Sequence, residues 1–88
     1  MTVRILVVED ETDLRSGLCD LLALEGYEAA GVGSIAAYHA WAENNHYDIL
    51  LLDRTLPDGE GLDILRAHRN AHGLPVIIMS GKGQPEDR

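Results

Sequence analysis

The sequence predicts an α/β fold in which helices cover both faces of an open, doubly wound parallel sheet. Two observations carry this prediction. Short apolar runs alternate with segments of helical periodicity in the order β-α-β-α-β-α-β, and this alternation favours parallel strands joined by right-handed crossovers. In addition, residues 5–8 and 49–52 are uninterrupted apolar runs, which is typical of parallel strands buried on both faces.

The four predicted strands differ in apolar character. Residues 4–8 (RILVV) and 49–53 (ILLLD) have the pattern of central strands. Residues 27–32 (YEAAGV) are a weaker strand whose small side chains suit a sheet edge or a close helix contact. Residues 76–79 (VIIM) follow Pro75 and form the fourth strand.

The first helix is expected to begin at Thr12 or Asp13, either of which can cap it, and to end at Gly26 in the left-handed conformation. Its apolar face is predicted from helical spacing. The residues of that face are Leu14, Leu18, Leu21 and Leu22.

The second and third helices are predicted from caps and apolar spacing. Ser34 is the expected N-cap of a helix over residues 35–43, in which Trp41 is the large packing anchor. A third helix is expected over residues 61–68. Its buried stripe comprises Leu62, Ile64 and Leu65.

Size and charge limit the classes of function. The chain has 88 residues, enough for one small domain, and its net charge of −8 argues against this segment binding nucleic acid or an anionic membrane. Its single cysteine, Cys19, excludes an internal disulfide. No apolar stretch approaches ~20 residues, and the N-terminus lacks the regions of a signal peptide. The sequence therefore predicts a cytoplasmic protein with no membrane partner.

Polar side chains end three of the predicted strands. Glu9 and Asp10 follow the first, Asp53 ends the third and Ser80 follows the fourth. The carboxyl ends of parallel strands share one edge, where ligands bind in such sheets. Clustered carboxylates repel one another unless a cation lies between them, and oxygen ligands suit Mg²⁺. A carboxylate can also attack a phosphoryl group, with Ser80 donating a hydrogen bond to it.

Each of these acids has a simpler explanation when it is taken alone. An acid at a strand end can cap the following helix or lie in a solvated loop. The coincidence of three such features at matching strand ends favours a site that holds a metal ion and a phosphoryl group, with Asp53 at its centre.

Four segments together resemble the receiver domain of bacterial two-component response regulators. They are residues 5–10 (ILVVED), 48–53 (DILLLD), 56–61 (LPDGEG) and 75–81 (PVIIMSG). The resemblance implies a flavodoxin-like sheet in the order 2-1-3-4-5. It also implies that a sensor histidine kinase transfers a phosphoryl group from a phosphohistidine to Asp53. Asp10 and Asp53 would then ligate Mg²⁺ directly, and Glu9 would act on the metal through water.

The resemblance implies roles for three further residues. The backbone carbonyl of Thr55 would be another metal ligand, and Ser80 would be the switch hydroxyl that moves toward the phosphoryl group. The side chains of Thr55 and Lys82 would tune how long the phosphate survives.

The chain departs from the family after its fourth strand. A receiver has a further helix, a fifth strand that ends in a lysine, and a fifth helix, and nothing in residues 1–88 matches that lysine. Lys82 lies at the wrong strand end for the role. Residues 1–88 are therefore predicted to be an incomplete receiver domain, truncated before the last helix, strand and helix. The remainder is absent, or disordered, or replaced by a second copy that covers the bare edge of residues 76–79 in a homodimer.

The resulting functional prediction is a regulatory phosphoacceptor, not an enzyme, which promotes its own phosphotransfer and dephosphorylation. Its output would be transcription, through a DNA-binding domain that is not in this chain. A phosphohydrolase with an aspartyl intermediate is disfavoured, because Thr55 stands where such enzymes commonly have a second acid. The alternative that remains is a receiver-like dimerisation or binding module that works without phosphate.

Overall fold

A computed structural model describes residues 2–53, 55–61, 63, 64, 66 and 75–79. Its elements are β1 (Arg4–Val8), α1 (Thr12–Leu24), β2 (Glu28–Val32), α2 (Ile35–Ala42), β3 (Ile49–Asp53), β4 (Thr55–Leu56), β5 (Gly59–Glu60) and β6 (Val76–Met79). Residues 61, 63, 64 and 66, which belong to the predicted third helix, are helical. None of the helices in this described part of the chain is long and apolar enough to cross a membrane.

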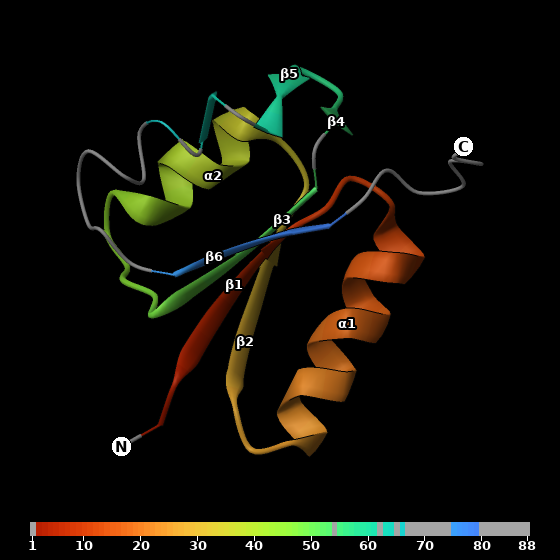
Figure 1. The fold of residues 1–88 in the computed structure, drawn as a ribbon, viewed down its shortest axis with the longest axis vertical. Coiled ribbons are helices and arrows are strands. Elements are labelled where there is room, and N and C mark those ends of the chain that lie inside the picture. Colours follow the sequence, from red (N-terminus) through yellow and green to blue (C-terminus); the bar gives the residue numbers. More distant parts are fainter. Residues whose placement is uncertain (1, 54, 62, 65, 67–74, 80–88) are drawn as a thin grey trace.

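The main sheet has four strands in the order β2-β1-β3-β6, and every neighbouring pair is parallel. Helices α1 and α2 lie on opposite sides of this sheet (Figure 1). This confirms the predicted doubly wound arrangement and brings the carboxyl ends of all four strands to one edge. At that edge Val8 pairs with both Val32 and Leu52, while Asp53 pairs with Met79.

The hydrophobic core lies on the α2 side of the sheet. Alternate residues of the two central strands point into it, because successive side chains of a strand face opposite ways. The buried cluster comprises Leu6, Val8, Tyr38, Tyr47, Leu50, Leu52, Leu56 and Ile64, and Trp41 packs against it, as expected for an anchor. Within it the hydroxyls of Tyr38 and Tyr47 lie 2.7 Å apart. Burial, with this hydrogen bond, raises the pKa of Tyr47.

Two predicted helix boundaries are confirmed. Gly26 has a φ of 95°, the left-handed conformation expected after a helix end. Ser34 caps α2, since its Oγ accepts a hydrogen bond of 3.0 Å from the backbone N–H of Ala37. Helix α1 begins at Thr12, as expected, but the predicted cap is wrong, because the N-cap is Glu11 in an extended conformation and Thr12 and Asp13 already lie within the helix.

The predicted apolar face of α1 is confirmed at Leu18 and Leu22, which are half-buried, and is wrong at Leu14 and Leu21. Leu14 and Leu21 are 37% and 56% exposed, and no residue of this helix is buried. The half-buried positions of α1 follow helical spacing, with Arg15 and Cys19 in place of the predicted Leu14 and Leu21; they are Arg15, Leu18, Cys19 and Leu22. The helix has this rotation because β2 offers Gly31, over which the stem of Arg15 and the Cys19 sulfur lie. Burial raises the pKa of the Cys19 thiol, in keeping with a packing role.

The segment after Asp53 forms a hairpin that the sequence did not predict. Two short antiparallel strands, β4 and β5, flank a turn at Pro57 and Asp58. The turn is fastened to α2, because Asp58 accepts hydrogen bonds from the backbone N–H groups of Ile35 (2.8 Å) and Ala36 (3.0 Å). The hairpin therefore joins the end of β3 to the start of α2.

Candidate metal centre

Three carboxylates meet at the carboxyl edge of the sheet. Asp53 is the last residue of β3, and Glu9 and Asp10 directly follow β1, the parallel neighbour of β3. One carboxylate oxygen from each of the three residues can be chosen such that all lie within 4.8 Å of one another. The structure thus brings together the three acids that the sequence singled out.

The three acids differ in exposure and in support. Glu9 and Asp53 are each only 1% exposed, whereas Asp10 is exposed. The backbone of Glu9 continues the strand pairing, since its N–H donates to the carbonyl of Val32 at 3.0 Å. Its Oε2 accepts a hydrogen bond of 2.9 Å from the N–H of Glu11. Two buried carboxylates are therefore held beside a third that is open to solvent.

This donor set fits a hard divalent cation. Burying a carboxylate is costly unless an opposite charge or hydrogen bonds offset the loss of water, and carboxylates this close to one another repel. The cluster offers oxygen ligands only, which suit Mg²⁺, and one exposed member leaves room for water or an oxyanion. These properties of the residues themselves favour a metal centre here.

A family model confirms the resemblance. The model described as the response regulator receiver domain matches residues 5–88. The chain belongs to the response regulator receiver domain family. It is therefore a module of two-component signal transduction. Receiver domains typically use Mg²⁺, and their family is not a conventional enzyme family.

Similar proteins of known role support this membership of the receiver family. The chain is 39% identical over 85 residues to the swarming motility regulation protein RssB of Serratia marcescens, covering 96% of this chain and 39% of the relative. It is 34% identical over 87 residues to the transcriptional regulatory protein PmrA of Pectobacterium parmentieri, covering 98% and 39%. The receiver chain thus spans about two fifths of the length of these relatives.

Solved receiver structures have the same fold. A CheY-like receiver domain from Methanospirillum hungatei matches with a TM-score of 0.85 and 32% identity, covering 96% of this chain and 68% of that one. TrrA of Thermotoga maritima, solved in complex with Mg²⁺-BeF, matches with a TM-score of 0.82 and 29% identity, covering 90% and 70%.

The other predicted site residues of the receiver domain are described only in part. Thr55 begins β4, two residues beyond Asp53, and its backbone is described while its side chain is not. Ser80 and Lys82 lie outside the described residues, and their predicted roles stay predictions.

One residue near the receiver's acidic cluster was missed by the sequence reasoning. The guanidinium of Arg15 donates a hydrogen bond of 2.8 Å from Nη1 to the backbone carbonyl of Glu9. An available signal was the pair of glycines at the end of β2, Gly31 and Gly33, which leaves room for a long side chain to cross the strand.

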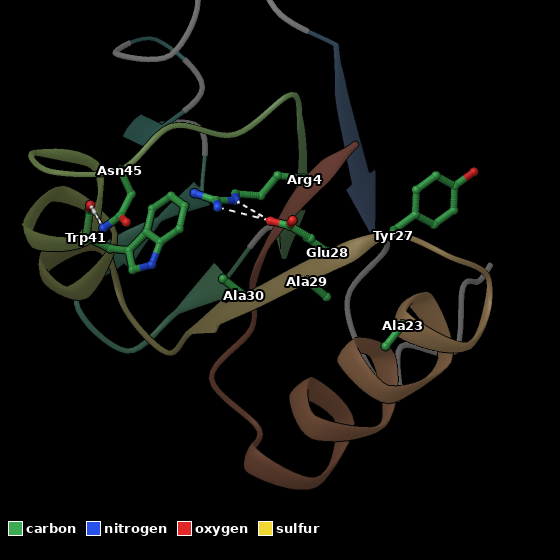
Figure 2. Close-up of a pocket in the computed structure, with 8 residues that line it drawn as sticks. All are labelled: Arg4, Ala23, Tyr27, Glu28, Ala29, Ala30, Trp41 and Asn45. Atoms are coloured by element: carbon green, nitrogen blue, oxygen red, sulfur yellow. Dashed lines mark hydrogen bonds and ion pairs between the residues drawn. The ribbon is translucent and has the colours of Figure 1, made fainter. Parts of the chain in front are cut away.

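A pocket of the receiver domain lies away from this cluster. It is found over β2, and Figure 2 shows Trp41 and Asn45 on one side of it and Ala23 and Tyr27 on the other. Arg4 and Glu28, which also line it, pair in register at the amino end of the sheet and form an ion pair of 3.0 Å. The pocket is therefore separate from the carboxyl edge that carries the acids.

Proposed function

We propose that Asp53 accepts the phosphoryl group, that Asp10 and Asp53 ligate Mg²⁺ directly, and that Glu9 acts on the metal through water. The observation that carries this proposal is the convergence of their carboxylate oxygens within 4.8 Å. Asp53 suits the role of nucleophile because it is the buried acid that ends a central strand.

Three further residues complete the proposed site. The backbone carbonyl of Thr55 supplies another metal ligand. The hydroxyl of Ser80 donates a hydrogen bond to a phosphoryl oxygen and moves toward it as the switch. The side chains of Thr55 and Lys82 set how long the phosphate survives. The basis for these roles is the position of each residue in the receiver motifs.

The proposed step moves one phosphoryl group between two side chains. A carboxylate oxygen of Asp53 attacks the phosphorus of a phosphohistidine on a sensor histidine kinase. The N–P bond breaks, its electron pair returns to the imidazole, and the imidazole takes up a proton. Mg²⁺, when bound, neutralises charge on the attacking oxygen and the phosphoryl oxygens. Water later hydrolyses the aspartyl phosphate within the same site and returns the carboxylate of Asp53.

The proposed output is the regulation of transcription. Among the similar proteins, PmrA and CpxR are transcriptional regulatory proteins, and the chain corresponds to 39% and 36% of their lengths. We infer a DNA-binding domain outside these 88 residues as the route to DNA, since a chain with a net charge of −8 lacks the basic surface that DNA requires.

TrrA in complex with Mg²⁺-BeF supports Mg²⁺ as the metal.

The test is phosphorylation by acetyl phosphate in the presence of Mg²⁺, read by intact mass. The wild-type protein should gain one phosphoryl group, and removing Mg²⁺ with EDTA should prevent the gain. Asp53→Asn should gain none, because an amide is not a competent nucleophile. Asp63→Asn is the matched control, since Asp63 is an exposed acid outside the cluster. A wild type that stays unmodified, or an Asp53→Asn protein modified as fully as the control, contradicts the proposal.

A second candidate function is association without phosphate. The observation that favours it is the exposure of Ile77 (54%) and Ile78 (44%) on β6. A Mg²⁺ titration distinguishes the two functions. Binding that depends on Asp10 and Asp53 supports the phosphoacceptor, and the absence of such binding supports a module that acts through its surface alone.

A further inference from the structure

The side chain of Arg15 crosses the end of β2 to reach the acidic loop. A Cβ placed on Gly31 would lie 2.8 Å from Cγ of Arg15, and a Cβ placed on Gly33 would lie 2.8 Å from its Nη1. The same Nη1 is 2.8 Å from the carbonyl oxygen of Glu9. The arginine stem and guanidinium therefore occupy a channel that exists because both strand positions lack a side chain.

The hydrogen bonds around Arg15 close the loop formed by residues 9–11. The N–H of Glu9 is held by Val32 at 3.0 Å, and the carbonyl of Glu9 is held by the guanidinium. The backbone N–H of Arg15 donates to the carbonyl of Glu11 at 2.9 Å, and the N–H of Glu11 donates to the Glu9 carboxylate at 2.9 Å. Arg15 thus contacts the loop at both of its ends.

This loop needs such support because of its charge. Glu9, Asp10 and Glu11 are consecutive acids, and the first two approach Asp53. Their mutual repulsion favours an opened loop with the carboxylates apart. A guanidinium always carries a positive charge, and a charge-assisted hydrogen bond to a carbonyl is stronger than a neutral one.

We propose that Arg15 is the positioning residue of the acidic loop: from its channel over Gly31 and Gly33 it holds the backbone of Glu9 so that Glu9 and Asp10 face Asp53. Its consequence for Mg²⁺ binding rests on the proposed function of the cluster. The guanidinium of Arg15 bonds the main chain of Glu9, and it therefore acts on the carboxylates through the backbone.

Two variants remove this support in different ways. Arg15→Met keeps an apolar stem but deletes the guanidinium. Gly33→Ala keeps the arginine and its charge but displaces Nη1, and alanine is tolerated because the φ of Gly33 is not positive. Gly17→Ala is the control for adding a methyl, as nothing lies within 4 Å of that Cβ. Arg4→Met is the control for losing an arginine, since Arg4 pairs with Glu28 at the opposite end of the sheet.

The first measurement is the dissociation constant for Mg²⁺ alone, by titration calorimetry on the full chain. Arg15→Met and Gly33→Ala should each raise the dissociation constant by about tenfold. This is the lower end of the loss of about 10–100-fold that is typical when a group that orients a metal ligand is removed. Arg15→Lys should recover part of the loss. Both controls should bind as the wild type does. If Gly33→Ala binds Mg²⁺ normally while Arg15→Met does not, the charge of Arg15 matters and its position does not, and the proposal is overturned.

The second measurement needs no metal. The Glu11 amide donates to the Glu9 carboxylate only while the loop is closed. The rate of hydrogen exchange at this amide in metal-free buffer therefore measures how often the loop opens. Exchange should be faster in Arg15→Met and Gly33→Ala and unchanged in Gly17→Ala. Unchanged exchange in both channel variants overturns the positioning role. Faster exchange in a protein whose wild type binds no Mg²⁺ supports positioning and refutes the metal centre, so the two failures are distinguishable.

Discussion

Asp10 differs from its two partners because it is the exposed member of the acidic cluster. Glu9 and Asp53 are each 1% exposed and are fixed by the ends of two neighbouring strands. Asp10, the residue after Glu9, lies at the surface and is open to solvent. Its carboxylate also adds repulsion to the two buried ones, so its contribution to stability depends on whether a cation is bound.

Asp10→Asn should therefore have opposite effects with and without Mg²⁺. In metal-free buffer the free energy of unfolding should rise by about 1 kcal/mol, the repulsion between unit charges roughly 4 Å apart in water. With saturating Mg²⁺ the variant should lose most of the stabilisation that the wild type gains, because a metal ligand is missing and affinity falls by about 10–100-fold. Urea unfolding with and without Mg²⁺ measures both effects.

Glu11→Gln is the matched control for this substitution. Glu11 is the next acid along the chain, is exposed, and is not a member of the cluster. The Glu11→Gln substitution should change the free energy of unfolding little and leave the stabilisation by Mg²⁺ intact. Equal responses of the two variants would mean that net charge, and not the cluster, governs metal binding.

The acids of the site were predictable and the arginine was not, for a physical reason. Glu9, Asp10 and Asp53 end strands, and parallel pairing alone brings strand ends to one edge. The place of Arg15 depends on which face of α1 meets β2, and Leu14 and Leu21 suggested a different rotation of the helix. Only the contact across Gly31 decides this rotation, and that contact is a property of two elements together.

The hairpin and α2 behave as one unit at the level of elements. Asp58 accepts from the N–H groups of Ile35 and Ala36, and Ser34 accepts from Ala37, so three N–H groups of the first turn are satisfied. The carboxylate also interacts favourably with the positive end of the helix dipole. A single side chain thereby links the hairpin that follows β3 to the first turn of α2.

These bonds predict a pH dependence of stability. The N–H donors of Ala36 and then Ile35 lower the pKa of Asp58. A lowered folded-state pKa means that the stabilisation is present above the ordinary aspartate value of about 3.9 and is lost as the pH falls through the lowered value. The melting temperature of Asp58→Asn should lie below that of the wild type at neutral pH, and the difference should shrink in acid. Thermal melts across an acid series measure it.

Asp63→Asn provides the comparison for the Asp58 melts. Asp63 is also exposed, and it pairs only loosely with Arg66 at 3.5 Å. Its melting temperature should differ little from that of the wild type at any pH. A gap between Asp58→Asn and wild type that persists unchanged in acid would contradict the role of the Asp58 carboxylate.

Elements that depend on the local sequence pattern were predicted, whereas the hairpin, which depends on its contact with α2, was not. Strands β1 and β3 are continuous apolar runs, and Ser34 and Gly26 mark helix ends through backbone chemistry that the sequence carries. The hairpin of β4 and β5 is too short to be identified from propensity. It is fastened by Asp58, whose partners lie more than twenty residues earlier in the chain.

At the scale of the whole molecule, the described residues are packed unevenly on the two sides of the sheet. The α2 side holds the buried cluster, whereas α1 on the other side has no buried residue and leaves Leu24 83% exposed. Strand β6 is paired with β3 along one edge. Ile77 and Ile78 are neighbours whose side chains point to opposite faces, and both are exposed, so within the described residues both faces of β6 are open.

An open apolar edge strand should pair with another copy of the chain. Unpaired strand edges with apolar side chains are templates for association, and a lysine on such an edge prevents it. Ile77→Lys should therefore weaken self-association by about tenfold or more, which corresponds to roughly 1.4 kcal/mol. Leu24→Lys adds the same charge to a more exposed apolar position that lies on a helix, and it should leave association nearly unchanged. Sedimentation velocity over a concentration series compares the three proteins. Equal weakening by both lysines would indicate general apolar contact instead of strand pairing, and a wild type that is monomeric at every concentration would exclude association through β6.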